Sequence, residues 1–361
     1  MINTIITLLY FILILGIIIV VHEFGHFFFA RLFNVHIYEF SLGMGPKIWG
    51  TKPKKGRRKK GKKPFVPFNI RAIPIGGYVS LAGEEAGDDD KSVPADGKLF
   101  NKPIWQRFLI MFFGAGNNFI LAFVFLILIG LFGGAQNMDP VVRNLDEKYP
   151  MYTEGIRVGD VITKIDNHGI STIDDVQVYM TIAKLKGKTI TIETERDGKK
   201  TSYNIVPTEE KDKDDNTLYK YGIVFENEYE YGFIPSLKFS VRKVGALCKQ
   251  MVIVLSSLFT GKLGLSSLSG PVGIYSVVGE ARSTGIINVL YLIALLSVNI
   301  GFINLIPLPA FDGGRIFFLL IEKIKGSPVD PKIENTIHNV GFIILMGLML
   351  VVTFNDIFHV F

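Results

Sequence analysis

Residues 2–32 of this 361-residue chain read INTIITLLYFILILGIIIVVHEFGHFFFARL. The stretch from Ile2 to Val21 carries no charge, and about 20 apolar residues of helix are enough to cross a bilayer. The helical pattern continues through Leu32. Because the stretch has neither a basic start nor a small-residue cleavage site, we expect a retained span rather than a signal peptide. The segment therefore predicts a membrane protein, with ionisable side chains placed at the end of an apolar run.

Three further apolar runs are long enough to span a bilayer. They lie between Arg107 and Asp139, between Arg282 and Asp312, and between about Asn335 and Asn355. The whole chain agrees, since 48% of its residues are hydrophobic and only 20% are charged. A fifth run, Gln250 to Gly261, is too short to span. Together with Pro235 to Lys249 it predicts an amphipathic helix lying in the membrane interface.

The loop between the first two spans contains a run of nine basic residues within 52–63: Lys52, Lys54, Lys55, Arg57, Arg58, Lys59, Lys60, Lys62 and Lys63. Basic residues near a span end are retained in the cytoplasm, so we expect this loop inside and both termini outside. The net charge of the chain is +6, and this cluster contributes to it. Contact with anionic lipid headgroups or a role as topology signal explains the cluster, so we expect no binding to nucleic acid. The single cysteine, Cys248, excludes an internal disulfide framework and a thiolate zinc site.

The segment from Asp139 to Tyr231, between spans two and three, is soluble in composition and predicted to be extracytoplasmic. Ile156 to Asn167 reads as a turn and a strand, Ile173 to Leu185 has helical spacing, and Thr189 to Pro207 reads as a hairpin closed by Asp-Gly. EGIRVGDVITKIDNHGI (154–170) and ERDGKK (195–200) resemble a PDZ domain. An unrelated small α+β domain is the alternative. We expect three parts: 1–136, the PDZ-like domain 137–231, and 232–361.

His22-Glu23-Phe24-Gly25-His26 is an H-E-x-x-H sequence. Residues four apart share a helix face, so both histidines can bind one metal ion while Glu23 takes a proton from metal-bound water. Ionisable side chains next to an apolar span are costly to bury and indicate a functional site. The alternative is that these residues only mark where the helix meets water.

A catalytic zinc takes three protein ligands and one water, so a third ligand is needed. Phe29 and Leu32 stand where a metzincin would have glycine and histidine, which excludes that pattern. Glu39 is one candidate. We favour Asp312, which ends the third span in NLIPLPAFDGG (304–314), because spans one and three run in the same direction and end at the same membrane level. The alternative for Asp312 is an ordinary helix-end residue.

Together these motifs are similar to the bacterial site-2 protease family of intramembrane zinc metalloproteases, in its RseP-like form with a single PDZ domain. The resemblance covers nearly the whole chain. Its other motifs are SLGMGP (41–46), AIPIGGYVSLAGE (72–84), GAGNNF (114–119) and SGPVGI (269–274). Ala115 stands where the family usually has proline, and Phe311 where it usually has leucine. Neither departure falls on an expected ligand.

The resemblance implies a fold and a set of site residues. The fold is an α-helical bundle of about four transmembrane helices with a membrane-associated β-hairpin at 70–81 and an inserted PDZ-like α+β domain. One zinc ion per chain would be held by His22, His26 and Asp312, with Glu23 as general base. Substrate would be bound by Gly76, Gly77 and Tyr78 of the hairpin, whose edge strand pairs with it, and by Asn304. Asn118 would help to hold the cavity, or would form a helix–helix hydrogen bond inside the bundle.

The function that follows is zinc-dependent cleavage within or near the transmembrane segments of single-span membrane proteins, with anti-sigma factors or remnant signal peptides as substrates by resemblance. We expect a multi-pass cell-membrane protein in contact with lipids, an active site near the cytoplasmic side, and a PDZ-like size filter outside. Two rivals are a non-proteolytic scaffold and a metal-ion transporter. Glu23 argues against the scaffold, and the scatter of His36, His168, His338 and His359 argues against the transporter.

Overall fold

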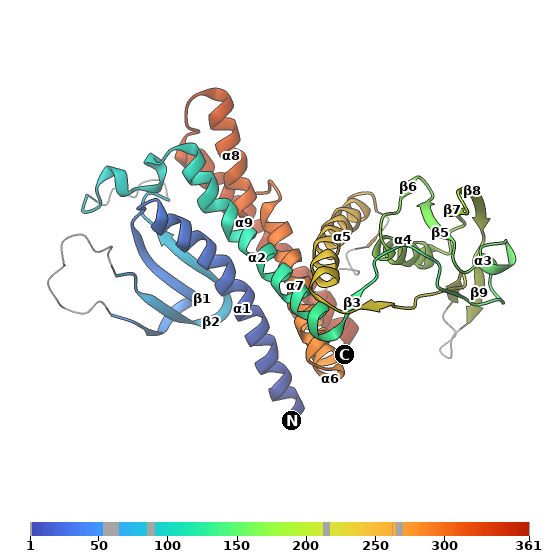
Figure 1. The fold of residues 1–361 in the computed structure, drawn as a ribbon. Helices are drawn as coiled ribbons and strands as arrows, with labels where there is room; N and C mark the ends of the chain where they lie inside the picture. Colours follow the sequence, from blue (N-terminus) through green and yellow to red (C-terminus); the bar gives the residue numbers. More distant parts are fainter. Residues whose placement is uncertain are drawn as a thin grey trace. The chain divides into compact units, whose positions relative to one another are not determined.

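The computed structural model describes residues 2–52, 65–84, 91–211, 217–261, 263–264 and 270–360. As predicted, four helices among these residues are long and apolar enough to cross a membrane: α1 (Ile2–Leu32), α2 (Ile104–Gly133), α7 (Ile286–Leu305) and α9 (Pro331–Val360) (Figure 1). The predicted basic run at 52–63, except Lys52, lies outside the described residues, as does Ser269.

The chain forms two compact units, Met1–Phe125 with Leu268–Phe361, and Leu126–Ser267. The first unit, here called the membrane unit, also contains α6 (Pro271–Thr284) and α8 (Asp312–Lys325). Neither short helix was expected from the sequence. The core of this unit joins α1, α6 and α7 through Ile14, Ile18, Val278, Val289, Leu292 and Ile293. Arg107 of α2 forms an ion pair with Glu322 of α8, and both side chains are largely buried.

Asp356, near the end of α9, fixes the start of α6. Its carboxylate accepts a hydrogen bond from the Gly273 N–H at 2.9 Å. Gly270, the residue before α6, lies against the same carboxylate, because a Cβ built there would be 2.9 Å from an oxygen of Asp356. A carboxylate at a helix N-terminus is electrostatically favourable, so this contact ties the start of α6 to α9.

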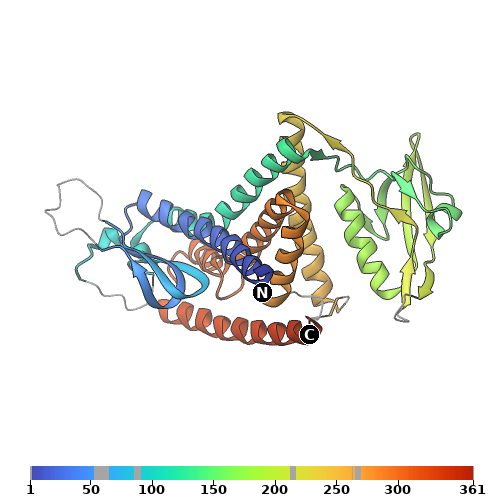
Figure 2. The same ribbon diagram turned by 90° about the horizontal axis from the view of Figure 1, so that it is seen from below.

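Two long strands, β1 (Ile37–Gly50) and β2 (Phe68–Leu81), pair antiparallel beside the C-terminal half of α1 (Figures 1 and 2). Phe40 pairs with both Val79 and Phe68, so the start of β1 lies between the two halves of β2. Gly43 and Gly76 have φ of +84° and +75°, a conformation that glycine adopts without strain, and they allow the strands to bend.

The prediction of a hairpin within residues 70–81 is therefore wrong in its detail. These residues belong to one strand, β2, and its pairing partner is β1. Gly76 and Gly77 mark a bend within β2 rather than a turn between two strands. The sequence did not reveal β1 because its residues, with two glycines and a proline in SLGMGP, lack the alternation that indicates a strand.

The second unit, 126–267, contains a four-stranded sheet in the order β6-β5-β7-β8. Its strands are β5 (Val161–Ile165), β6 (His168–Gly169), β7 (Ile190–Arg196) and β8 (Lys199–Ile205), and α4 (Ile173–Lys186) packs on it through Val176 and Met180. The remaining elements are α3 (Pro150–Thr153), β3 (Ala135–Gln136), β4 (Asn144–Leu145), β9 (Thr208–Lys211), β10 (Thr217–Lys220), β11 (Ile223–Val224) and β12 (Tyr229–Glu230). The strand, helix and Asp197-Gly198 hairpin predicted from the sequence are all present.

Helix α5 (Phe233–Phe259) is continuous and belongs to this second unit, not to the C-terminal part in which the sequence placed it. One face packs on α4, where Lys243 pairs with Asp174 at 2.8 Å and Lys249 pairs with Asp175 at 2.7 Å. The opposite face exposes large apolar side chains, namely Ile234, Val241, Val252 and Phe259. The helix is amphipathic, as the sequence indicated.

Candidate metal centre

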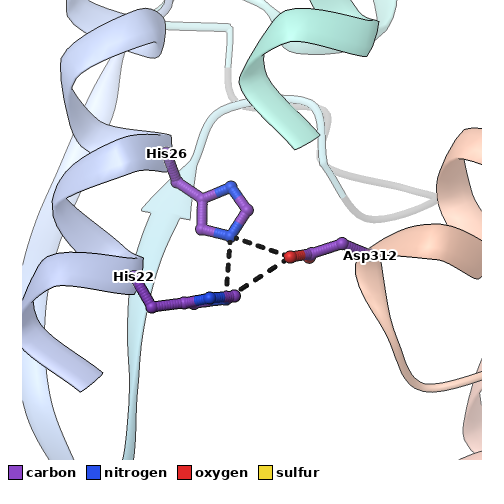
Figure 3. Close-up of side chains that lie close together, drawn as sticks. All are labelled: His22, His26 and Asp312. Carbon is purple, nitrogen blue, oxygen red and sulfur yellow. Dashed lines mark hydrogen bonds and ion pairs between the residues drawn. The ribbon is translucent and has the colours of Figure 1, made fainter. Parts of the chain in front are cut away.

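The structure brings His22, His26 and Asp312 together although Asp312 is far away in sequence (Figure 3). Both histidines project from α1, and Asp312 is the first residue of α8, directly after the proline-containing loop at 306–311. The Nε2 atoms of the histidines are 3.3 Å apart. Asp312 Oδ2 is 3.4 Å from His22 Nε2 and 3.3 Å from His26 Nε2. Three ligand atoms therefore form a nearly equilateral triangle.

The donor set and its spacing fit a zinc ion. The point equidistant from three atoms so placed lies roughly 1.9 Å from each, close to the zinc–ligand distances of about 2.0–2.2 Å found for histidine and carboxylate. Asp312 Oδ2 is buried and accepts no hydrogen bond from the described residues. Two imidazole nitrogens and a carboxylate oxygen suit zinc, and three protein ligands leave a fourth position for water.

His26 is held in the orientation that a metal ligand needs. Its Nδ1 lies 2.8 Å from the Ile110 carbonyl oxygen of α2. A carbonyl can only accept, so Nδ1 must carry the proton, and Nε2 keeps its lone pair for a metal. The contact also ties α1 to α2 at the level of the site.

Asn118 of α2 contacts the His22 ring at Nδ1. The amide nitrogen of Asn118 lies 3.4 Å from His22 Nδ1, and its Oδ1 is buried without a partner among the described residues. The two ends of an amide are nearly identical in shape. If the amide is rotated by half a turn, Oδ1 accepts a hydrogen bond from His22 Nδ1 and leaves Nε2 free for a metal. Asn118 thus lies against a ligand, not against the space where substrate would bind.

Glu23 lines a cavity of about 170 Å³ together with the three ligands. Its other lining residues are Gly77, Tyr78, Val79, Leu81, Glu84, Met111 and Arg315. The Glu23 side chain is buried, and Gly77 lies directly against it, because a Cβ built on Gly77 would be 3.0 Å from Glu23 Cγ. The carboxylate is therefore placed in the same small space as the ligands.

The last part of β2, from Gly77 to Leu81, forms one wall of this cavity. One edge of this segment pairs with β1, and among the described strands none pairs with its other edge. An open strand edge presents backbone N–H and C=O groups that can pair with an extended peptide.

The remaining predicted substrate residues lie at different distances from this wall. Tyr78 belongs to it, whereas Gly76 lies at the bend of β2 next to the Met44 side chain. Asn304 is half-buried in the last turn of α7, and it is not among the described residues that line the cavity.

Glu39, the alternative third ligand, is engaged elsewhere. Its carboxylate accepts hydrogen bonds from Tyr78, Arg71 and Asn69 on the β1–β2 sheet. Burial acts to raise the pKa of Glu39, but the hydrogen bonds from Tyr78 and Arg71 outweigh it and hold this pKa below its ordinary value. Glu39 therefore serves to position Tyr78 at the cavity wall.

Arg315 and Glu84 also line the cavity, and the sequence analysis missed both. The Arg315 guanidinium donates a hydrogen bond to Glu84, which connects the start of α8 to the end of β2. The available signal was their position, since Glu84 is the last residue of the motif AIPIGGYVSLAGE and Arg315 directly follows FDGG. The guanidinium of Arg315 brings a positive charge to the cavity, and Glu84 balances it.

The chain is similar to known proteins along nearly its whole length. Residues 10–348 match peptidase family M50. The chain is 34% identical to the Fusobacterium nucleatum protein named "Putative zinc metalloprotease FN1322" over 357 residues, which cover 98% of this chain and 99% of that protein. It is 30% identical to "Zinc metalloprotease RasP" of Shouchella clausii over 430 aligned residues, covering 98% and 99% of the two chains.

Proposed function

The chain belongs to peptidase family M50, the site-2 proteases, and is a zinc metalloprotease of the membrane, and from this premise we propose that it cleaves peptide bonds within or near the transmembrane segments of single-span membrane proteins. One observation carries the proposal. The cavity that contains Glu23 and the three ligand side chains is also lined by Gly77, Tyr78, Val79 and Leu81 of β2, a segment with one edge unpaired among the described strands, so the proposed general base and the proposed peptide-binding segment share one space.

His22, His26 and Asp312 would hold one zinc ion per chain. When bound, zinc polarises a scissile carbonyl and lowers the pKa of a coordinated water. Glu23, whose side chain lies in the same cavity, would accept the proton of the attacking water and deliver it to the leaving nitrogen of the scissile bond. The Glu23 side chain is buried, which limits the access of bulk water to its carboxylate.

The edge of β2 from Gly77 to Leu81 explains how a membrane helix can be cut. A helix satisfies its own backbone hydrogen bonds and hides its peptide groups, so the scissile segment must first be unwound. An extended segment pairing with β2 would regain those hydrogen bonds at the cavity. Gly77 contributes by having no side chain between Glu23 and the strand.

The sidedness of the protein belongs to the same proposal. The basic loop after β1 favours a cytoplasmic location for that loop, with the catalytic cavity near the cytoplasmic side. The PDZ-like domain would then be extracytoplasmic and would exclude substrates with large outer domains. By resemblance, we propose anti-sigma factors or remnant signal peptides as the substrates.

The test is cleavage of a tagged single-span protein by the purified chain in detergent, with bound zinc quantified for each variant. We expect wild type to cut, Glu23→Gln to retain zinc without cutting, and Asp312→Ala to lose zinc. If Glu23→Gln cuts as fast as wild type, the proposed chemistry is wrong. If several weak metal sites appear instead of one tight site, a transporter becomes the better hypothesis.

A further inference from the structure

The loop that carries Asp312 contains a strained residue. Ala310 has a φ of +76°, in the left-handed region that is unfavourable for an alanine because its Cβ approaches the following carbonyl oxygen. The other non-glycine residues with positive φ in the described part of the chain are Asn34, Asp166 and Asp197, whose side-chain types tolerate this region. Ala310 therefore needs an external cause. It lies two residues before a metal ligand, where such strain is informative.

Helix α9 supplies that cause through His338. The Ala310 N–H donates a hydrogen bond to His338 Nδ1 at 3.2 Å. One turn further along α9, Gly341 lies against the residue before Ala310, because a Cβ built on Gly341 would be 2.2 Å from Pro309 Cβ. The His338 ring also reaches the start of α8, since a Cβ on Gly314 would be 3.2 Å from its Cε1. One face of α9 thus contacts the loop on both sides of Asp312.

The hydrogen bonding of the His338 ring indicates that this position needs a histidine because Nδ1 accepts the Ala310 N–H. Because the backbone N–H donates, Nδ1 must be the unprotonated nitrogen, and the neutral ring carries its proton on Nε2. His338 Nε2 is buried and has no hydrogen-bond partner among the described residues. A buried polar atom without a partner is destabilising, so an apolar side chain would serve better if packing were its only task.

We propose that His338 of α9 is a positioning residue for the metal centre: its Nδ1 holds Ala310 in the left-handed conformation that directs Asp312 toward His22 and His26. The inference rests on the proposed zinc chemistry for its consequence, but its contacts are independent of it. The fourth membrane helix, which contributes no ligand, then determines how tightly the third ligand is held.

The experiment compares zinc affinity, measured by competition with a chelator, in His338→Leu and His338→Asn of the full chain. Leucine preserves bulk and removes the acceptor, whereas asparagine places an oxygen near the position of Nδ1. We expect His338→Leu to weaken zinc binding about tenfold, the low end for residues that support metal ligands, and His338→Asn to stay within about threefold of wild type. His168→Leu, a histidine stacked on Tyr179 in the other unit, is the matched control.

A second variant separates positioning from packing. Ala310→Gly adopts a positive φ without strain, so a loop with glycine at this position depends less on His338. We expect His338→Leu to cost less zinc affinity in the Ala310→Gly background than in wild type. Equal losses for leucine and asparagine, or an unchanged loss in the glycine background, would overturn the inference. If wild type itself bound no zinc, the proposed function would fail instead.

Discussion

Gly114 of α2 faces His26 so closely that a Cβ built on it would lie 2.2 Å from His26 Nε2. The approach is mutual, because a Cβ on Gly25 of α1 would lie 1.9 Å from the Phe113 carbonyl oxygen. The two helices therefore meet backbone to backbone at the HEFGH sequence, as small residues allow in membrane proteins. The nitrogen that this contact crowds is the one available to a metal.

Substitution Gly114→Ala should therefore abolish zinc binding while leaving most of the fold in place. The added methyl group must displace the His26 ring, and an imidazole moved by even 1 Å leaves the triangle of ligand atoms. Bound zinc in the purified variant is the measurement. Gly16→Ala on α1 is the control, since nothing lies within 4 Å of a Cβ there, and it should bind zinc as wild type does. Full zinc occupancy in Gly114→Ala would contradict the packing described.

Substitution of Asn118 should separate support of a ligand from binding of substrate. With the amide rotated so that Oδ1 faces His22, Asn118→Leu removes the acceptor for His22 Nδ1, and we expect zinc affinity to fall roughly 10- to 100-fold. Asn118→Asp keeps an acceptor and should bind zinc at least as tightly as wild type. Competition with a chelator measures both. A raised KM with unchanged zinc affinity would instead assign Asn118 to the substrate.

Acid should destabilise the second unit, 126–267, through Asp160. Burial acts to raise the pKa of Asp160, but hydrogen bonds from Arg196 and the Arg157 N–H, with the charge of Arg196, hold this pKa below its ordinary value. A carboxylate with a lowered folded-state pKa contributes stability above its unfolded pKa of about 3.9, and this stability is lost as pH falls through the folded value.

Asp160→Asn should accordingly lower stability at pH 7 by roughly 1.5–3 kcal/mol, the usual contribution of hydrogen bonds to charged groups. It should also flatten the loss of stability below about pH 4. Hydrogen exchange of the β5 and β7 amides, followed from pH 7 to pH 3, reports on this unit within the full chain. Identical pH profiles for wild type and variant would show that the ion pair is not the cause.

Removing one partner of the buried Lys243–Asp174 pair should destabilise the protein more than replacing both partners with apolar residues. Its side chains are only 7% and 9% exposed, so Lys243→Met leaves an uncompensated carboxylate between α5 and α4. We expect a loss of about 3 kcal/mol, and recovery of most of it in the double variant Lys243→Met/Asp174→Leu. Exchange of the α4 amides provides the measurement. Additive losses in the double variant would mean that the pair is not coupled.

Much of this structure could be predicted where the sequence signal is local. The uncharged runs gave four spans, and HEFGH placed two histidines and Glu23 on one helix because i and i+4 residues share a face. The Asp-Gly pair at 197–198 similarly gave a hairpin, since these residues adopt the positive φ that a tight turn requires.

The missing parts depend on contacts between distant segments. Strand β1 has no alternating pattern and becomes visible only through its register with β2. In the sequence, His338 is an isolated histidine in an apolar helix, and its role becomes visible only through its contact with Ala310. The role of Asn118 was ambiguous because it likewise depends on a contact with a distant residue, His22. The sequence did not predict helices α6 and α8, because neither is long enough to be recognised from its hydropathy.

The three ligand atoms come from nearly opposite ends of the chain, two from α1 and one from α8. Because translation proceeds from the N-terminus, both histidines are synthesised long before Asp312. A nascent chain that ends before Asp312 therefore has only two of the three candidate ligands. Under the proposed function, the metal site can be completed only after most of the polypeptide has been made.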